Sequence, residues 1–134
     1  MRVVTLAHAH GARVVVNADT RLAQAVGADG VHLTSVALMR LEARPQVRLV
    51  SASCHSAEEL AKAAELGLDY VQLSPVLPTL SHPGAPVLGW DAFTALVGEC
   101  PLPVYALGGV SRAHLETAWA AGAHGIAMLR GAWS

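Results

Sequence analysis

Short apolar runs alternate along the chain with segments in which apolar residues recur at helical spacing. Leu22, Ala23 and Val26, for example, fall on one face of a helix, whereas the runs between such segments are short and rich in valine and leucine. This alternation predicts strands that are joined by helices. The predicted strands are residues 13–17, 30–33, 49–53, 70–73, 103–107 and 125–129.

The junction from helix to strand repeats three times. A small-residue helix end is followed by Gly27, Gly67 or Gly122, then by one or two residues and an apolar run. A glycine just past a helix adopts the left-handed conformation without a Cβ penalty, and the aliphatic residues that follow suit a strand buried on both faces. These junctions predict a parallel sheet wrapped by helices, with chemistry at the strand ends.

The length of the chain limits the size of this sheet. An eight-stranded β/α barrel typically needs roughly 200 residues or more, and this chain has 134. We therefore expect one domain over residues 1–134, an incomplete barrel that opens with the end of a helix at residues 6–10. Either the chain is a fragment of a longer protein, or a second chain covers the gap. Because an uncovered apolar edge invites association, we expect a homo-oligomer.

Composition narrows the class of protein. Hydrophobic residues make up 53% and charged residues 14%, which suffices for one sizeable core. The net charge is −1 and there is no basic stripe, which argues against a nucleic-acid partner. No apolar run approaches a membrane span or a signal peptide, so we expect a cytoplasmic protein without a membrane partner. Cys54 and Cys100 lack metal-type spacing, and no structural disulfide is expected.

A serine and a histidine at the end of the third predicted strand are candidates for chemistry. Strand alternation places Ser53 and His55 on one side and Cys54 on the other. It therefore favours a Ser53–His55 polar pair, in which the histidine can move protons near neutral pH. The alternative is that His55 only caps the next helix or satisfies a buried backbone group. Five other histidines lack metal-ligand spacing and are predicted to be structural: His8, His10, His32, His114 and His124.

Two segments near the C-terminus predict an anion site. Gly108 and Gly109 follow the fifth predicted strand, where glycine lets the backbone approach an anion and free N–H groups point at it. Arg130 follows the last strand and would add a second wall to a phosphate site. The alternatives are a tight turn for the glycine pair and a solvated surface charge for Arg130.

Residues 75–89 form one long irregular stretch that is rich in proline and glycine. Such a stretch in a β/α protein is typical of an active-site loop. Its prolines stiffen the chain and present Thr79, Ser81 and His82 above the strand ends. A rigid connector without a ligand is the alternative.

Short motifs follow one another along the chain at Asn17, 27–33, 53–55, 69–71, 74–79, Gly89, 106–110 and 122–127. Their order resembles that of the thiamine phosphate synthase/TenI family. The resemblance covers the chain from about Leu6 onward and aligns it with strands three to eight of that family's TIM-type barrel, which implies that the chain is N-terminally incomplete. Versions fused behind a Nudix hydrolase domain are the most similar, because they share the triplet at residues 53–55 and the loop at residues 82–90.

The resemblance implies a protein of thiamine biosynthesis that binds a thiazole or thiamine phosphate. The substrate-binding residues that it implies are Asn17, Ser53, Thr79, His82, Gly108, Gly109 and Arg130.

The family's synthase joins a pyrimidine pyrophosphate to a thiazole phosphate, with magnesium held by acidic residues. Here Ala18 stands where the family has an aspartate, and the second acidic position falls within residues 35–37, which carry no acid. A pyrophosphate leaving group needs a divalent cation to neutralise its charge. We therefore expect no metal ligands and no cofactor, with magnesium only if synthase activity is retained.

The TenI branch is similar in the Ser-x-His-Ser sequence at residues 53–56. This similarity implies a metal-independent thiazole tautomerase with His55 as its acid/base catalyst, which is the first prediction. The alternatives are a thiamine phosphate synthase, a non-catalytic thiamine-phosphate-binding module of a Nudix fusion protein, and an inert remnant that offers only an interaction surface.

Overall fold

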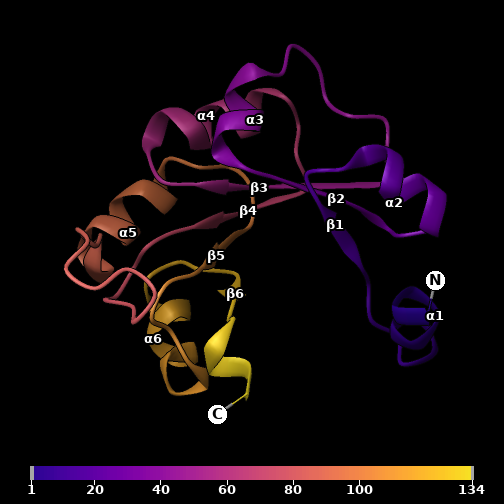
Figure 1. The fold of residues 1–134 in the computed structure, drawn as a ribbon. Helices are drawn as coiled ribbons and strands as arrows, with labels where there is room; N and C mark the ends of the chain where they lie inside the picture. The colour runs from indigo at the N-terminus through magenta and orange to yellow at the C-terminus, as the bar shows by residue number, and fades with distance from the viewer. Residues whose placement is uncertain (1, 134) are drawn as a thin grey trace.

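The computed structural model describes residues 2–133, which form one parallel sheet of six strands in sequence order (Figure 1). The predicted strand number, direction and order are confirmed, and the bounds differ by at most three residues at either end. The strands are β1 (Val15–Asn17), β2 (Gly30–Leu33), β3 (Leu49–Cys54), β4 (Tyr70–Leu73), β5 (Val104–Ala106) and β6 (Gly125–Ile126).

Helices connect successive strands, as the alternating pattern predicts. Side chains of Asp19, Thr34 and Ser56 cap the N-termini of three of them by accepting backbone N–H bonds. None of the helices within residues 2–133 is long and apolar enough to cross a membrane. The helices are α1 (Arg2–Ala9), α2 (Thr20–Val26), α3 (Ser35–Arg40), α4 (Ala57–Glu65), α5 (Gly89–Gly98) and α6 (Leu115–Ala120), with short 3-10 turns η1 (Arg112–His114) and η2 (Arg130–Trp133).

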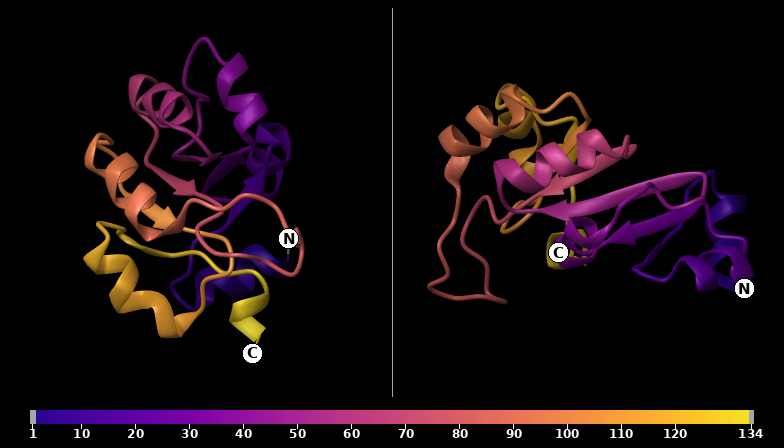
Figure 2. Two further views of the ribbon diagram at one scale, coloured as in Figure 1. Left: turned by 90° about the vertical axis from the view of Figure 1, so that its left-hand side faces the viewer. Right: turned by 90° about the horizontal axis from the view of Figure 1, so that it is seen from above.

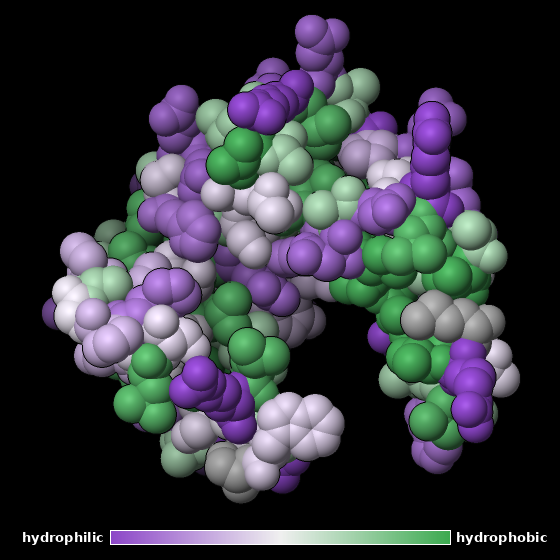
Figure 3. All heavy atoms as spheres, viewed as in Figure 1, coloured by the Kyte–Doolittle hydropathy of each residue, from purple (hydrophilic) through white to green (hydrophobic). Residues whose placement is uncertain are grey.

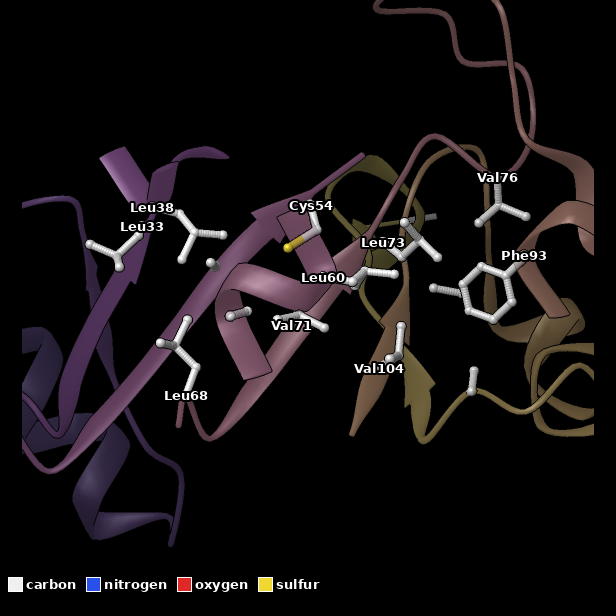
Figure 4. Packing of buried hydrophobic residues seen from close by; sticks show 14 of the residues in the cluster. Leu33, Leu38, Cys54, Leu60, Leu68, Val71, Leu73, Val76, Phe93 and Val104 are labelled. Atoms are coloured by element: carbon white, nitrogen blue, oxygen red, sulfur yellow. The ribbon is translucent and has the colours of Figure 1, made fainter. Parts of the chain in front are cut away.

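The sheet is apolar on one face only, which corrects the prediction of strands buried on both faces. Along β3, Val50, Ala52 and Cys54 are fully buried beneath the helices. Figure 4 shows the same layer, in which strand residues pack against Leu60 of α4 and Phe93 of α5. The helices therefore cover one face of the sheet and leave the other face to polar residues.

Polar and aromatic side chains occupy that opposite face. The parallel register sets His32 on β2 beside Ser51 on β3. Tyr105 makes edge-to-face contacts with Tyr70 and with His124, with ring centroids 5.4 Å apart in both pairs. In a sheet that curls towards a barrel, this is the concave side.

Two aspartates tie the N-terminal ends of the strands together. Asp29 Oδ2 accepts from the Val14 backbone N–H at 2.7 Å and lies 2.9 Å from His8 Nε2. Asp69 repeats the arrangement with the Val50 N–H at 2.8 Å and the Arg44 guanidinium at 2.7 Å. The hydrogen bond from the Val14 N–H, followed by that from His8, holds the pKa of Asp29 below its ordinary value.

The sheet is open, because β1 and β6 each pair with one neighbour. The ribbon shows the open side between α1 and the C-terminal segment, and the space-filling view shows a broad hollow there (Figures 1 and 3). Val3 and Leu6 on α1 are 57% and 63% exposed. These features fit the expected association of chains, which stays a prediction.

Candidate functional site

A cavity of about 730 Å³ lies at the C-terminal ends of β3 to β6. Its walls come from the end of β3, the connection from β4 to α5, the turn after β5 and the segment after β6. The connection, salmon in Figure 2, extends away from the sheet and contains no helix or strand between residues 74 and 88. This is the volume of a site for a small molecule.

Six of the eight predicted site residues line this cavity, and two do not. Asn17 ends the edge strand β1 and is exposed, and Ser53 faces the concave side of the sheet. The residues that the fold brings together are His55, Thr79, His82, Gly108, Gly109 and Arg130.

His55 directly follows β3 and is held at both its backbone and its ring. Its N–H donates to Glu59 Oε1 at 2.6 Å, within an N-terminal capping arrangement in which Ser56 Oγ accepts from the Glu59 N–H. Its ring Nδ1 lies 3.0 Å from the carbonyl oxygen of Ser74 and 3.3 Å from the Ser74 hydroxyl. Ser74, which is only 8% exposed, is a site residue that sequence reasoning missed.

The expected Ser53–His55 pair is replaced by two other pairs. Ser53 Oγ lies 2.8 Å from Nε2 of His32, and Ser51 Oγ lies 2.7 Å from the other ring nitrogen. Strand alternation stops at Cys54, where β3 ends, so it does not extend to His55. Burial lowers the pKa of His32, which keeps this ring neutral at neutral pH.

The buried thiol beside the site is unsuited to nucleophilic chemistry, as the alternation of β3 predicts. Burial, reinforced by the carboxylate of Glu59, raises the pKa of Cys54 to about 12. The thiol therefore stays protonated at neutral pH.

The glycine pair serves the packing of the cavity wall as well as offering N–H groups. Gly108 and Gly109 have φ of 100° and 65°. A Cβ at Gly109 would lie 2.4 Å from the carbonyl oxygen of Pro78, and one at Gly108 would lie 2.8 Å from Cα of Pro75. Within residues 2–133, neither glycine N–H donates a hydrogen bond. Both readings of the pair, a tight turn and an anion cradle, are thus compatible with this geometry.

The other predicted polar residues differ in how free they are. Thr79 Oγ1 accepts from the backbone N–H of His82 at 3.1 Å, so the threonine stabilises its own turn. Arg130 opens η2 and is exposed at the cavity wall. Its guanidinium can therefore turn towards an anion in the cavity.

The residues at the positions expected to hold magnesium do not fit that ion. Ala18 has no ligand atom, and Asp19 Oδ1 accepts from the Leu22 N–H at 2.9 Å as the cap of α2. Residues 2–133 contain no group of three or more histidine, cysteine, aspartate or glutamate side chains that could hold a metal.

Comparisons with known proteins give the family to which this chain belongs. A family model described as thiamine monophosphate synthase, TMP-TENI, matches residues 1–132. A putative thiamine-phosphate synthase of Geobacter sulfurreducens is 40% identical over 89% of this chain and 58% of its own length. A thiamine-phosphate synthase of Thioalkalivibrio sulfidiphilus is 35% identical over 96% of this chain and 63% of its own length.

A solved structure supports the same relationship. Thiamine phosphate pyrophosphorylase from Pyrococcus furiosus superposes with a TM-score of 0.75 and 29% identity, over 92% of this chain and 60% of that one. This chain therefore spans about three fifths of the length of these proteins. The matched family model covers nearly all of the chain, which thus belongs to the thiamine monophosphate synthase (TMP-TENI) family.

Proposed function

We propose that this chain is the thiazole-phosphate-binding part of a thiamine-phosphate synthase. The observation that carries the proposal is the cavity at the strand ends, which has free glycine N–H groups and Arg130 at its wall. It is supported by the names of the relatives, which favour a synthase over the tautomerase that the sequence predicts first.

The phosphate would bind between the turn after β5 and the start of η2. The N–H groups of Gly108 and Gly109 are available there, and two adjacent N–H groups in positive-φ conformations form an anion-binding concavity. Arg130 would add a charge-assisted contact from the start of η2.

The heterocycle would lie on the apolar part of the cavity. Leu77, Leu107 and Met128 line it and offer an aliphatic and thioether surface to a flat ring. His55 also lines the cavity and would contact the ring rather than the phosphate.

Joining the pyrimidine to the thiazole requires a bound divalent cation, and this chain lacks suitable residues at the expected positions. The residues at the expected magnesium positions do not fit the ion, and the chain spans about three fifths of its relatives' length. We therefore propose thiazole phosphate binding for this chain, and the joining reaction is tested separately below.

A second candidate function, thiazole tautomerisation, is favoured by one observation. His55 lines the cavity with its ring oriented by Ser74, and proton transfer by a histidine needs no metal ion. Binding without turnover is the outcome expected if neither reaction occurs.

Calorimetric titration with thiazole phosphate tests the binding proposal. Arg130→Gln should weaken binding about tenfold, because a charge-assisted contact contributes about 1.5 kcal/mol or more. Arg21→Gln, on the exposed face of α2, is the matched control and should bind as the wild type does. Equal affinity of Arg130→Gln and the wild type would contradict the proposed phosphate site.

Two activity assays then separate the candidate functions. Magnesium-dependent formation of thiamine phosphate from both precursors would support the synthase. Tautomerisation that persists in the presence of a chelator and disappears in His55→Ala would support the second candidate.

A further inference from the structure

The ring of His55 is held in a way that determines which of its nitrogens carries the proton. Nδ1 lies 3.0 Å from the carbonyl oxygen of Ser74. A carbonyl oxygen only accepts hydrogen bonds, so Nδ1 must be the donor in this contact. The Ser74 hydroxyl, at 3.3 Å, can add a second and weaker acceptor. In the neutral ring, Nε2 is then the nitrogen with the free lone pair.

Nε2 of His55 can therefore accept a hydrogen bond from a ligand in the cavity. Within residues 2–133, Nε2 of His55 has no hydrogen-bond partner, and His55 is among the residues that line the cavity. A ring turned over about its Cβ–Cγ bond would lose the contact between Nδ1 and the buried Ser74.

We propose that Ser74 is a positioning residue that fixes His55 as the Nδ1–H tautomer and so makes Nε2 the hydrogen-bond acceptor of the cavity. A ligand must therefore present a proton donor to this point, which can be an N–H, an O–H or an acidified C–H group. This inference rests on the proposed function, because it takes the cavity as the ligand site.

Another histidine of the chain provides an internal control with the opposite tautomer. Nδ1 of His114 accepts from the backbone N–H of Ser111 at 2.9 Å, so the proton of its neutral ring must be on Nε2. One protein therefore contains both tautomers at known positions, and both are measured in the same sample.

Nitrogen-15 NMR of the imidazole rings tests the proposal without any ligand. At a pH where both rings are neutral, His55 should show a protonated Nδ1 and an unprotonated Nε2, and His114 the reverse. Single variants His55→Asn and His114→Asn assign the two signal sets. A protonated Nε2 at His55, or signals averaged between two tautomers, would overturn the proposal.

Two variants test the role of Ser74 and of the free lone pair. Ser74→Ala keeps the backbone carbonyl, so the His55 tautomer should be retained, and its loss would contradict the assignment to the carbonyl. His55→Asn keeps a donor for Ser74 but has no acceptor at the place of Nε2, so thiazole phosphate should bind about tenfold more weakly. Unchanged affinity would overturn the acceptor role.

The two proposals fail separately. Absence of thiazole phosphate binding to the wild type, with the His55 tautomer as expected, would contradict the proposed function and leave the tautomer assignment standing.

Discussion

At the scale of single residues, Gly109 lies where the turn after β5 packs against the cavity loop. Gly109→Ala should destabilise the fold by about 1–3 kcal/mol more than Gly84→Ala, because its Cβ would meet the Pro78 carbonyl oxygen at 2.4 Å. Gly84 is a matched control with φ of 76° and nothing within 4 Å of its Cβ. Urea unfolding measures both, and equal losses would show that positive φ alone determines the cost.

Asp69 makes the stability of the fold depend on pH in the acid range. Burial raises the pKa of Asp69, but the hydrogen bonds from Arg44 and from the Val50 N–H outweigh it and hold the pKa below 3.8. A lowered pKa means that the carboxylate stabilises the fold above pH 3.8 and that this contribution is lost as the pH falls further.

Asp69→Asn should therefore cost about 1 kcal/mol at pH 7, a small value because the side chain is 36% exposed. The difference from the wild type should shrink as the pH falls to about 3. Glu42→Gln, a change at an exposed residue, is the control. A difference in unfolding midpoint that grows on acidification would contradict this assignment.

The sequence predicts which residues surround the cavity better than it predicts their partners. His55, His82 and Gly109 reach the cavity because each follows a strand, and parallel strands end at one edge. The partner of Ser53 depends on the register between β2 and β3, which sets His32 beside it and which no local pattern specifies. Ser74 was missed because its contribution to the site is mainly a backbone carbonyl.

At the scale of elements, the start of α4 connects helix capping with the position of His55. Glu59→Ala removes the acceptor of the His55 N–H and should cost about 1 kcal/mol more than Glu58→Ala. Both residues lie in the first turn of α4, so the helix-dipole contribution largely cancels between them. Chemical denaturation measures the difference, and equal stabilities would show that the Glu59–His55 contact contributes nothing.

The elements were predictable where local physics decides them. Glycine after a helix, a serine cap at Ser56 and short aliphatic runs define helix ends and strands without tertiary information. The burial of the strands was mispredicted, because the second face is covered only if a barrel closes. The segment before β6 is divided into the 3-10 turn η1 and the helix α6, and His114 in η1 bonds back to Ser111, a contact that helical spacing does not indicate.

At the scale of the whole molecule, the open sheet should make the chain associate. Leu6 is 63% exposed on α1, the helix beside the open side (Figure 1), and Leu80 is 84% exposed on the cavity loop. Sedimentation should detect dimers or larger species at high concentration. Leu6→Ser should weaken the association, and Leu80→Ser should not. A monomer at all concentrations would contradict the expectation.

Amide NMR shows whether the cavity at the strand ends binds a phosphate. On titration with thiazole phosphate, the N–H signals of Gly108 and Gly109 should shift the most, because neither group donates a hydrogen bond within residues 2–133 and both can bind the phosphate. The signals of Gly27 and Gly67, which end helices away from the cavity, should stay unchanged. Shifts confined to residues outside the cavity, or none at saturating ligand, would contradict phosphate binding in the cavity.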